Sequence, residues 1–216
     1  MSEKIIVLDT ETANGLDCPF AYDIGFVVTD YTGKVYEQHS YAISDIIFDD
    51  DMMDTAYYKD KLPQYWQEIK DGIRELKSLH YVKSFLYEVC AKYDINKVYA
   101  HNARFDWKSC TYTQRYITKS AYRYFFPKHV SICDTLKYAR NVMSKNTHYR
   151  KFCKDNGYLT KNKQNRYTAE ILYRYISKNP SFNELHKGLD DVLIEKEILK
   201  YCYKKQPEFD SRLWAS

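Results

Sequence analysis

A short apolar run that ends in two carboxylates constrains this chain more than any other stretch. Residues 4–8 read Lys-Ile-Ile-Val-Leu, and Asp9, Thr10 and Glu11 follow at once. An uninterrupted run of branched apolar residues is typical of a buried central strand, whose alternating side chains would put Asp9 and Glu11 on one face. Two such carboxylates favour a hard divalent cation such as Mg²⁺ or Mn²⁺. Alone, the pair is better explained by polar residues where a strand meets solvent.

Length and composition indicate one globular domain. The chain has 216 residues, of which 44% are hydrophobic, with 6 glycines and 5 prolines, so we predict a single domain over residues 1–216 with its core at about 4–204 and a short C-terminal tail. No apolar stretch approaches the roughly 18 to 20 residues of a membrane span, and the start does not resemble a signal peptide. The six cysteines include no C-x-x-C pair. We therefore expect reduced thiols in a soluble cytoplasmic protein that does not bind membranes.

Charge is distributed unevenly along the chain although the net charge is only +4. Residues 44–60 are rich in aspartate, whereas residues 145–166 are rich in lysine and arginine. The basic block is equally consistent with contact to a polyanion and with a solvated helical face. The 23 tyrosines could stack on bases or simply fill core and surface.

Periodicity predicts a mixed α/β fold. The spacing of apolar residues and turn formers predicts strands over residues 4–12, 22–30, 35–43, 97–102 and 129–135. It predicts helices over residues 63–94, 103–120, 136–143, 150–156, 167–177 and 188–204. Residues 44–61 show no clean period and are expected to form a loop or lid. A three-strand meander followed by alternating strands and helices gives a mixed five-stranded sheet flanked by helices.

Further acids stand where such a sheet would gather them. Asp106 follows the fourth strand by four residues, where it could serve the helix dipole or point back to the sheet edge. Asp191 shares a helical face with Ile194 and Ile198, and a carboxylate on a buried face needs a partner or a cation. His186, five residues before Asp191, could accept a proton from water beside such a cluster, although a lone loop histidine is usually inert.

Three ordered segments then resemble a known family. Asp9-Thr10-Glu11-Thr12, the stretch 101–106 (His-Asn-Ala-Arg-Phe-Asp), and His186 with Asp191 are similar to the motifs of the DEDDh branch of the DnaQ-like 3′–5′ exonucleases, of the ribonuclease H-like superfamily. The segment 132–136 also resembles one that this family carries between its second and third motifs. The likeness covers residues 4 to about 203. Lys187 stands where the sister branch has tyrosine, so the histidine branch fits better.

The resemblance implies a reaction and a metal requirement. It implies that Asp9, Glu11, Asp106 and Asp191 hold two Mg²⁺ (or Mn²⁺) ions about 3.5 to 4 Å apart. His186 would deprotonate a water that attacks the terminal phosphodiester, releasing nucleoside 5′-monophosphates from the 3′ ends of single-stranded nucleic acid, with DNA favoured. The third motif departs from the family at residues 188–190, where relatives often carry a small residue and an apolar pair. Residues 44–61 match nothing in the family.

The resemblance also suggests substrate contacts. Thr12 would meet the terminal nucleotide, and His101, Asn102 and Phe105 would shape its pocket, although Phe105 could equally belong to the core. Five basic residues could hold the trailing strand through sequence-independent phosphate contacts: Lys151, Lys154, Lys161, Lys163 and Arg166.

Other functions remain open at this stage. An exoribonuclease that trims RNA 3′ ends differs by contacts to the 2′-hydroxyl, which the sequence does not display. A catalytically quiet module that grips a nucleic acid or a polymerase is disfavoured because all four acids and the histidine are present. Any role in DNA proofreading or repair would use a polymerase in trans, and the sequence does not indicate the oligomeric state.

Overall fold

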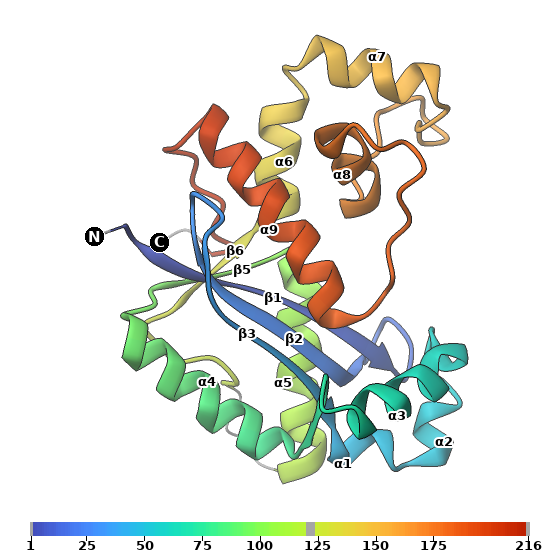
Figure 1. Cartoon of the computed structure of the whole chain (residues 1–216), viewed down its shortest axis with the longest axis vertical. Coiled ribbons are helices and arrows are strands. Elements are labelled where there is room, and N and C mark those ends of the chain that lie inside the picture. The colour runs from blue at the N-terminus through green and yellow to red at the C-terminus, as the bar shows by residue number, and fades with distance from the viewer. Residues whose placement is uncertain (1, 120–123, 215–216) are drawn as a thin grey trace.

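A mixed six-stranded sheet runs through the protein in the order β4-β3-β2-β1-β5-β6, as the computed structural model shows (Figure 1). The structure describes residues 2–119 and 124–214. The central strand β1 pairs antiparallel with β2 and parallel with β5. The strands are β1 Lys4–Ala13, β2 Phe20–Asp30, β3 Val35–Ile43, β4 Glu75–Lys77, β5 Lys97–Ala100 and β6 Ser131–Asp134.

The predicted mixed α/β class is confirmed, with six strands where five were predicted. The extra strand, β4, interrupts residues 63–94, for which a continuous helical pattern was predicted. The chain leaves the helix after Lys70, and Gly72 adopts a positive φ of 71°. Residues 75–77 then pair in parallel with β3 before Ser78 caps the next helix through the Tyr81 N–H. Apolar residues on both sides of the break happen to keep a helical spacing, which hid the strand.

The expectation of a loop over residues 44–61 is wrong. This segment folds into α1 Ser44–Ile47, α2 Asp50–Met53 and the 3₁₀ turn η1 Lys59–Lys61. Its apolar side chains, including Met53 and Ala56, are buried in the core, which fixes the segment without any regular period.

The remaining helices lie close to their predicted positions. The predicted end of the fourth-strand helix at Ser120 lies outside the described residues, and within them that helix ends at Thr118. The helices are α3 Leu62–Lys70, α4 Leu79–Tyr93, α5 Ala103–Thr118, α6 Thr135–Met143, α7 Thr147–Asp155, α8 Ala169–Ser177 and α9 Gly188–Lys205.

The two faces of β1 pack against different helices. Ile6 and Leu8 belong to a core shared with α4 and α5, whereas Ile5 and Val7 belong to one shared with α6, α8 and α9. Figure 1 shows these two groups of helices on opposite sides of the sheet. Continuing the alternation, the odd-numbered acids of β1 lie on the face that α9 covers.

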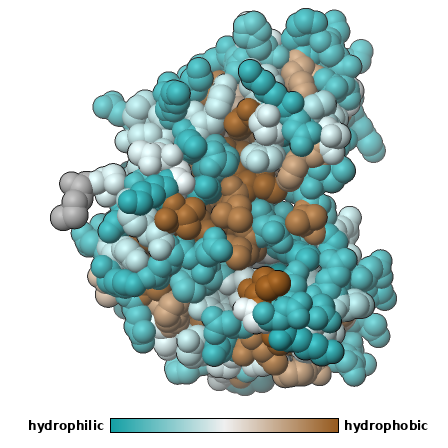
Figure 2. Space-filling model, in the orientation of Figure 1, coloured by the Kyte–Doolittle hydropathy of each residue, from teal (hydrophilic) through white to brown (hydrophobic). Residues whose placement is uncertain are grey.

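The surface drawn in Figure 2 is largely polar and most of the thiols are buried. Hydrophilic residues cover much of the face drawn in Figure 2, with apolar residues gathered towards its middle. All six cysteines are free and five are buried. Among the described helices, none combines the length and the apolar character needed to cross a bilayer.

Two glycines let α9 begin directly against β2. A Cβ on Gly25 would lie 2.2 Å from the Leu189 backbone nitrogen, and a Cβ on Gly188 would lie 2.7 Å from the Gly25 nitrogen. Such distances are far below van der Waals contact, so the two backbones can meet only where both residues lack side chains. The close approach sets the distance of the first turn of α9 from the sheet.

We expect Gly25→Ala to push the start of α9 away from β2. The new methyl group would meet backbone atoms that cannot rotate aside, so the free energy of unfolding should fall by about 3 kcal/mol or more, measured by urea denaturation. Gly15→Ala is the matched control because a Cβ there meets nothing within 4 Å, although its φ is +70°. The control should cost about 1 kcal/mol of backbone strain. Equal losses in the two variants would contradict the close approach.

Candidate active site

Carboxylates from several elements converge on one cavity at the end of β1. Asp9 and Glu11 are its β1 members, and the ladder with β2 shifts register directly after Glu11. The cavity has a volume of about 960 Å³. The titratable side chains that line it are Asp9, Glu11, Tyr58, His101, Asp106, Arg140, Arg166, Tyr167, Glu184, His186, Asp191 and Glu195.

Asp106 is fixed to the middle of the β1 motif. Its Oδ1 accepts hydrogen bonds from the Thr10 backbone nitrogen at 3.1 Å and from Thr10 Oγ1 at 2.9 Å. The turn that carries it is also tied, because Asp134 accepts from the backbone nitrogens of Asn102 and Leu136. Asp134 is therefore the N-cap residue of α6. Asn102 occupies the N-cap position of α5 but makes no side-chain capping bond and has a left-handed φ of 73°.

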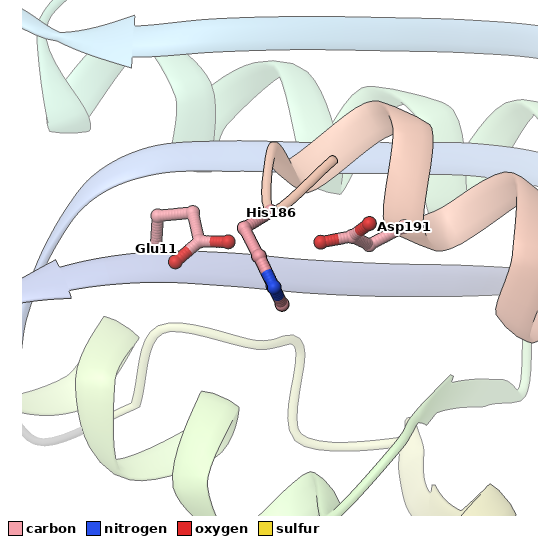
Figure 3. A group of neighbouring side chains, drawn as sticks. All are labelled: Glu11, His186 and Asp191. Atoms are coloured by element: carbon pink, nitrogen blue, oxygen red, sulfur yellow. The ribbon is translucent and has the colours of Figure 1, made fainter. Parts of the chain in front are cut away.

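Glu11, His186 and Asp191 face one another across the cavity. One ligand atom from each lies within 4.8 Å of the others. Figure 3 shows these side chains, which come from β1, from the turn before α9 and from α9 itself. Asp191 is 6% exposed, and its buried Oδ1 has no hydrogen-bond partner among the described residues. A buried carboxylate oxygen without a donor is costly, and a cation satisfies it. This donor set of oxygens with one imidazole nitrogen fits a divalent ion.

The electrostatics of the cavity also call for positive charge. Burial, followed by repulsion from neighbouring carboxylates such as Asp23, raises the pKa of Glu11 to about 9. Burial and the adjacent Asp190 raise the pKa of Asp191 to about 7. The pKa of Asp9 also lies well above its usual range, first because of burial and then because of other acids. A bound cation would remove this penalty and keep the carboxylates ionised.

Glu195 is a further buried acid of the cavity that the sequence analysis missed. It is 3% exposed, follows Asp191 by one helical turn, and accepts a hydrogen bond from the His101 backbone nitrogen at 3.1 Å. Burial, with Asp106 and Asp191 nearby, raises its pKa well above the usual range. Its position four residues after Asp191, on the same inward face as Ile198, was the signal that could have found it.

Glu184 completes the acidic lining from the segment before α9. Burial and repulsion from Asp191 raise its pKa to about 8. Glu184 stands outside every motif, so the sequence carried no signal for it.

Three of the four residues predicted to contact the terminal nucleotide line the cavity. His101, Asn102 and Phe105 line the cavity, whereas Thr12 is not among its lining residues. The His101 ring is engaged by the protein itself, since Nε2 donates to the Tyr167 carbonyl at 2.8 Å and Nδ1 lies 3.1 Å from Thr135 Oγ1. Their contact with a nucleotide stays a prediction.

The basic block divides between the cavity and the surface beside it. Arg166 lines the cavity, and its Nε donates to the Leu159 carbonyl. The turn before it is closed by the Leu159–Asn165 bridge. Four lysines of the block are exposed on α7 and on this turn: Lys151, Lys154, Lys161 and Lys163. Arg140, which the sequence analysis did not single out, adds a second guanidinium group to the lining.

Comparison with solved structures identifies the fold. E. coli exonuclease I in complex with a 5cy-dT13 oligonucleotide matches 96% of this chain with a TM-score of 0.60 and 14% identity, and the match covers 42% of that chain. The zinc ion bound form of the E. coli ExoI–ssDNA complex gives a TM-score of 0.55 over 96% of this chain and 42% of that one, at 14% identity. Exonuclease X in complex with 5′ overhanging duplex DNA covers 97% and 96% of the two chains at 17% identity, with a TM-score of 0.48.

The two exonuclease I likenesses confirm the predicted fold class, a mixed sheet flanked by helices. The chain thus has the fold found in exonuclease I, and it spans about 42% of the length of that protein. A scan of protein-family models gives no match. A search of the curated proteins gives none either.

We expect Mg²⁺ or Mn²⁺ to stabilise the protein through this cavity. At a concentration 100 times the dissociation constant, the ion should raise the free energy of unfolding by about 2.7 kcal/mol, seen as a shift of the thermal transition. Asp191→Asn should reduce the shift and weaken the binding measured by calorimetry, because one charged ligand is removed. Glu88→Gln, an exposed acid of α4, is the control and should behave as wild type. An unchanged shift in Asp191→Asn would argue against a cation at this site.

Proposed function

We propose that this protein is a metal-dependent 3′–5′ exonuclease that removes nucleoside 5′-monophosphates from single-stranded nucleic acid, with DNA as the favoured substrate. The observation that carries the proposal is the meeting of Asp9, Glu11, Asp106, His186 and Asp191 in one cavity. These residues come from three distant stretches of the chain, and no folding requirement explains why so many acids should be buried together. The fold, shared with exonuclease I bound to an oligonucleotide, supports the same reaction class.

The four carboxylates would hold the metal ions of this reaction. Two bound Mg²⁺ or Mn²⁺ ions would activate water and neutralise charge at the scissile phosphate. The carboxylates of Asp9, Glu11, Asp106 and Asp191 would be the ligands, and the orphaned Oδ1 of Asp191 is available for this role. The existence of a zinc ion bound form of the exonuclease I complex supports a metal in this fold. Without a cation, this set of acids would repel a phosphate diester.

His186 would serve as the general base. It lies beside the acids, and burial followed by the Lys61 charge lowers the pKa of its imidazole. A neutral imidazole can accept a proton from water near neutral pH, which the protonated form cannot do.

The substrate would be a nucleic-acid 3′ end rather than a small phosphate ester. The cavity of about 960 Å³ exceeds what a single phosphate needs, and its lining residues Thr160, Gln164 and Arg166 flank the exposed Lys161 and Lys163 in the chain. Bound oligonucleotides in the solved exonuclease I complexes support single-stranded DNA. A role in proofreading or repair inside the cell, with any polymerase acting in trans, would follow from this activity.

Digestion of 5′-labelled oligonucleotides tests the proposal directly. Purified protein with Mg²⁺ should shorten single-stranded DNA stepwise from its 3′ end and release nucleoside 5′-monophosphates. Parallel RNA substrates of the same sequence report the sugar preference, and faster RNA digestion would favour the RNA-trimming alternative. Blocking the 3′ end should stop the reaction. Absence of digestion with either metal would overturn the proposed function.

The catalytic assignments predict two different losses. Asp9→Asn should abolish nucleotide release because a charged metal ligand is removed, while the fold is retained in circular dichroism. His186→Ala should lower kcat by about 10² to 10⁴ if the imidazole is the general base. Glu88→Gln is again the matched control. Wild-type rates in either active-site variant would remove that residue from the mechanism.

The exposed lysines predict a salt dependence of binding. If Lys161 and Lys163 neutralise phosphates, replacing both with Gln should lower the slope of log K against log salt by about 0.7 on single strands for each phosphate that is no longer neutralised. Binding can be measured by fluorescence anisotropy in the presence of Ca²⁺, with EDTA as a second condition. The control is Lys204→Gln with Lys205→Gln in the last turn of α9, about 27 Å along that helix from its start. Identical slopes in both double variants would place the strand elsewhere.

A further inference from the structure

A tyrosine from residues 44–61 lies against the histidine of the site. The rings of Tyr58 and His186 stack with 4.3 Å between centroids and 10° between planes. Tyr58 also lines the same cavity. Figure 1 shows α1, α2 and α3 beside the end of β1 from which the acids emerge. The segment that matches nothing in the family thus contacts the proposed general base.

Lys61 ties the tyrosine and the histidine turn together. Its Nζ donates to the backbone carbonyl of Leu185, the residue before His186. The same ammonium lies 4.9 Å from the centroid of the Tyr58 ring, within the range of a cation–π contact. One side chain therefore holds both the ring that stacks and the backbone that carries the imidazole.

The turn before α9 depends on such outside support. His186 has a left-handed φ of 51° although it is not glycine, a conformation that costs roughly 1 kcal/mol or more. No hydrogen bond to the imidazole occurs among the described residues, so hydrogen bonding does not set its plane. The backbone after it is anchored by Lys187 to Glu68 and by the Gly188 nitrogen to Asp23. The His186 imidazole itself is supported by stacking on the Tyr58 ring.

The residues that precede Tyr58 in the chain are attached to the core. Met53 and Ala56 are buried, and Thr55 Oγ1 accepts from the Asn14 backbone nitrogen at 2.7 Å. Asn14 directly follows β1, so this bond joins residues 53–56 to the strand that carries Asp9 and Glu11. Through the Tyr58 stack, the position of the His186 imidazole is therefore fixed relative to β1, the strand that also carries the carboxylates.

We propose that Tyr58, held by Lys61, is a positioning residue that fixes the imidazole plane of His186 in the active site. Residues 44–61 then hold the side chain of the general base in place. This assignment rests on the proposed exonuclease function. The contact acts through the faces of the rings, so a phenyl ring would perform it as well as a phenol. The competing role for Tyr58 is direct stacking on a nucleotide base.

A double-mutant cycle separates these two roles. Tyr58→Ala should lower kcat about tenfold or more with little change in KM, and Tyr58→Phe should restore most of the activity. In the His186→Ala background the Tyr58→Ala change should have no further effect, because the residue acts only through the imidazole. A raised KM, or an equal loss in both backgrounds, would overturn the proposal in favour of base stacking. Tyr81→Ala is the matched control, since Tyr81 is 42% exposed and lies outside the cavity lining.

A spectroscopic readout tests the stack without any activity. The His186 ring-proton resonances, identified by their disappearance in His186→Ala, should be shielded by the Tyr58 ring in wild type. They should move downfield in Tyr58→Ala and stay in place in Tyr58→Phe and in Tyr81→Ala. Unmoved resonances in Tyr58→Ala would overturn the positioning role. If wild-type protein digests no nucleic acid, the proposed function fails, and these resonances alone decide whether Tyr58 holds His186.

Discussion

The whole site depends on a buried aspartate that does not itself line the cavity. Asp23 is fully buried on β2 and accepts hydrogen bonds from Tyr65, from Arg74 and from the backbone nitrogen of Gly188. It is the direct cross-strand neighbour of Glu11. Removing one member of a buried charged network leaves the others without partners and is strongly destabilising. Asp23 therefore joins the acidic strand, the first turn of α9 and the helix α3 in one arrangement, and the Gly25–Gly188 contact sets their spacing.

Burying many carboxyl groups around Asp23 lowers the free energy of unfolding. The carboxyl groups of Glu11, Asp106 and Asp191 all have raised pKa values, with burial as the largest cause. Each would be cheaper exposed or replaced by an apolar residue, so the cluster opposes folding in the absence of a cation. The rest of the molecule tolerates this cost because both faces of the sheet are packed with apolar side chains. The same repulsion that destabilises the empty cluster favours binding of a divalent ion.

Sequence reasoning succeeded where a contact follows from local spacing. The alternation along β1 placed Asp9 and Glu11 on one face, and the helical steps from Asp191 to Ile198 placed that acid inward. It failed where a contact joins distant segments. The Tyr58–His186 stack links an irregular segment with a turn, and neither has a period to read. Strand β4 was missed because three residues are too few to interrupt an apolar pattern. The spacing of Glu195 from Asp191 and Ile198 indicated an inward-facing side chain, but Glu195 belonged to no motif.

The alternation of a single strand explains how helices on opposite sides of the sheet reach one cavity. Asp9 and Glu11 project towards the face covered by α9, which supplies Asp191. Thr10, between them, binds Asp106 of α5 through both its backbone nitrogen and its hydroxyl. Because successive residues of a strand point to opposite faces, three consecutive residues can engage both helices at once.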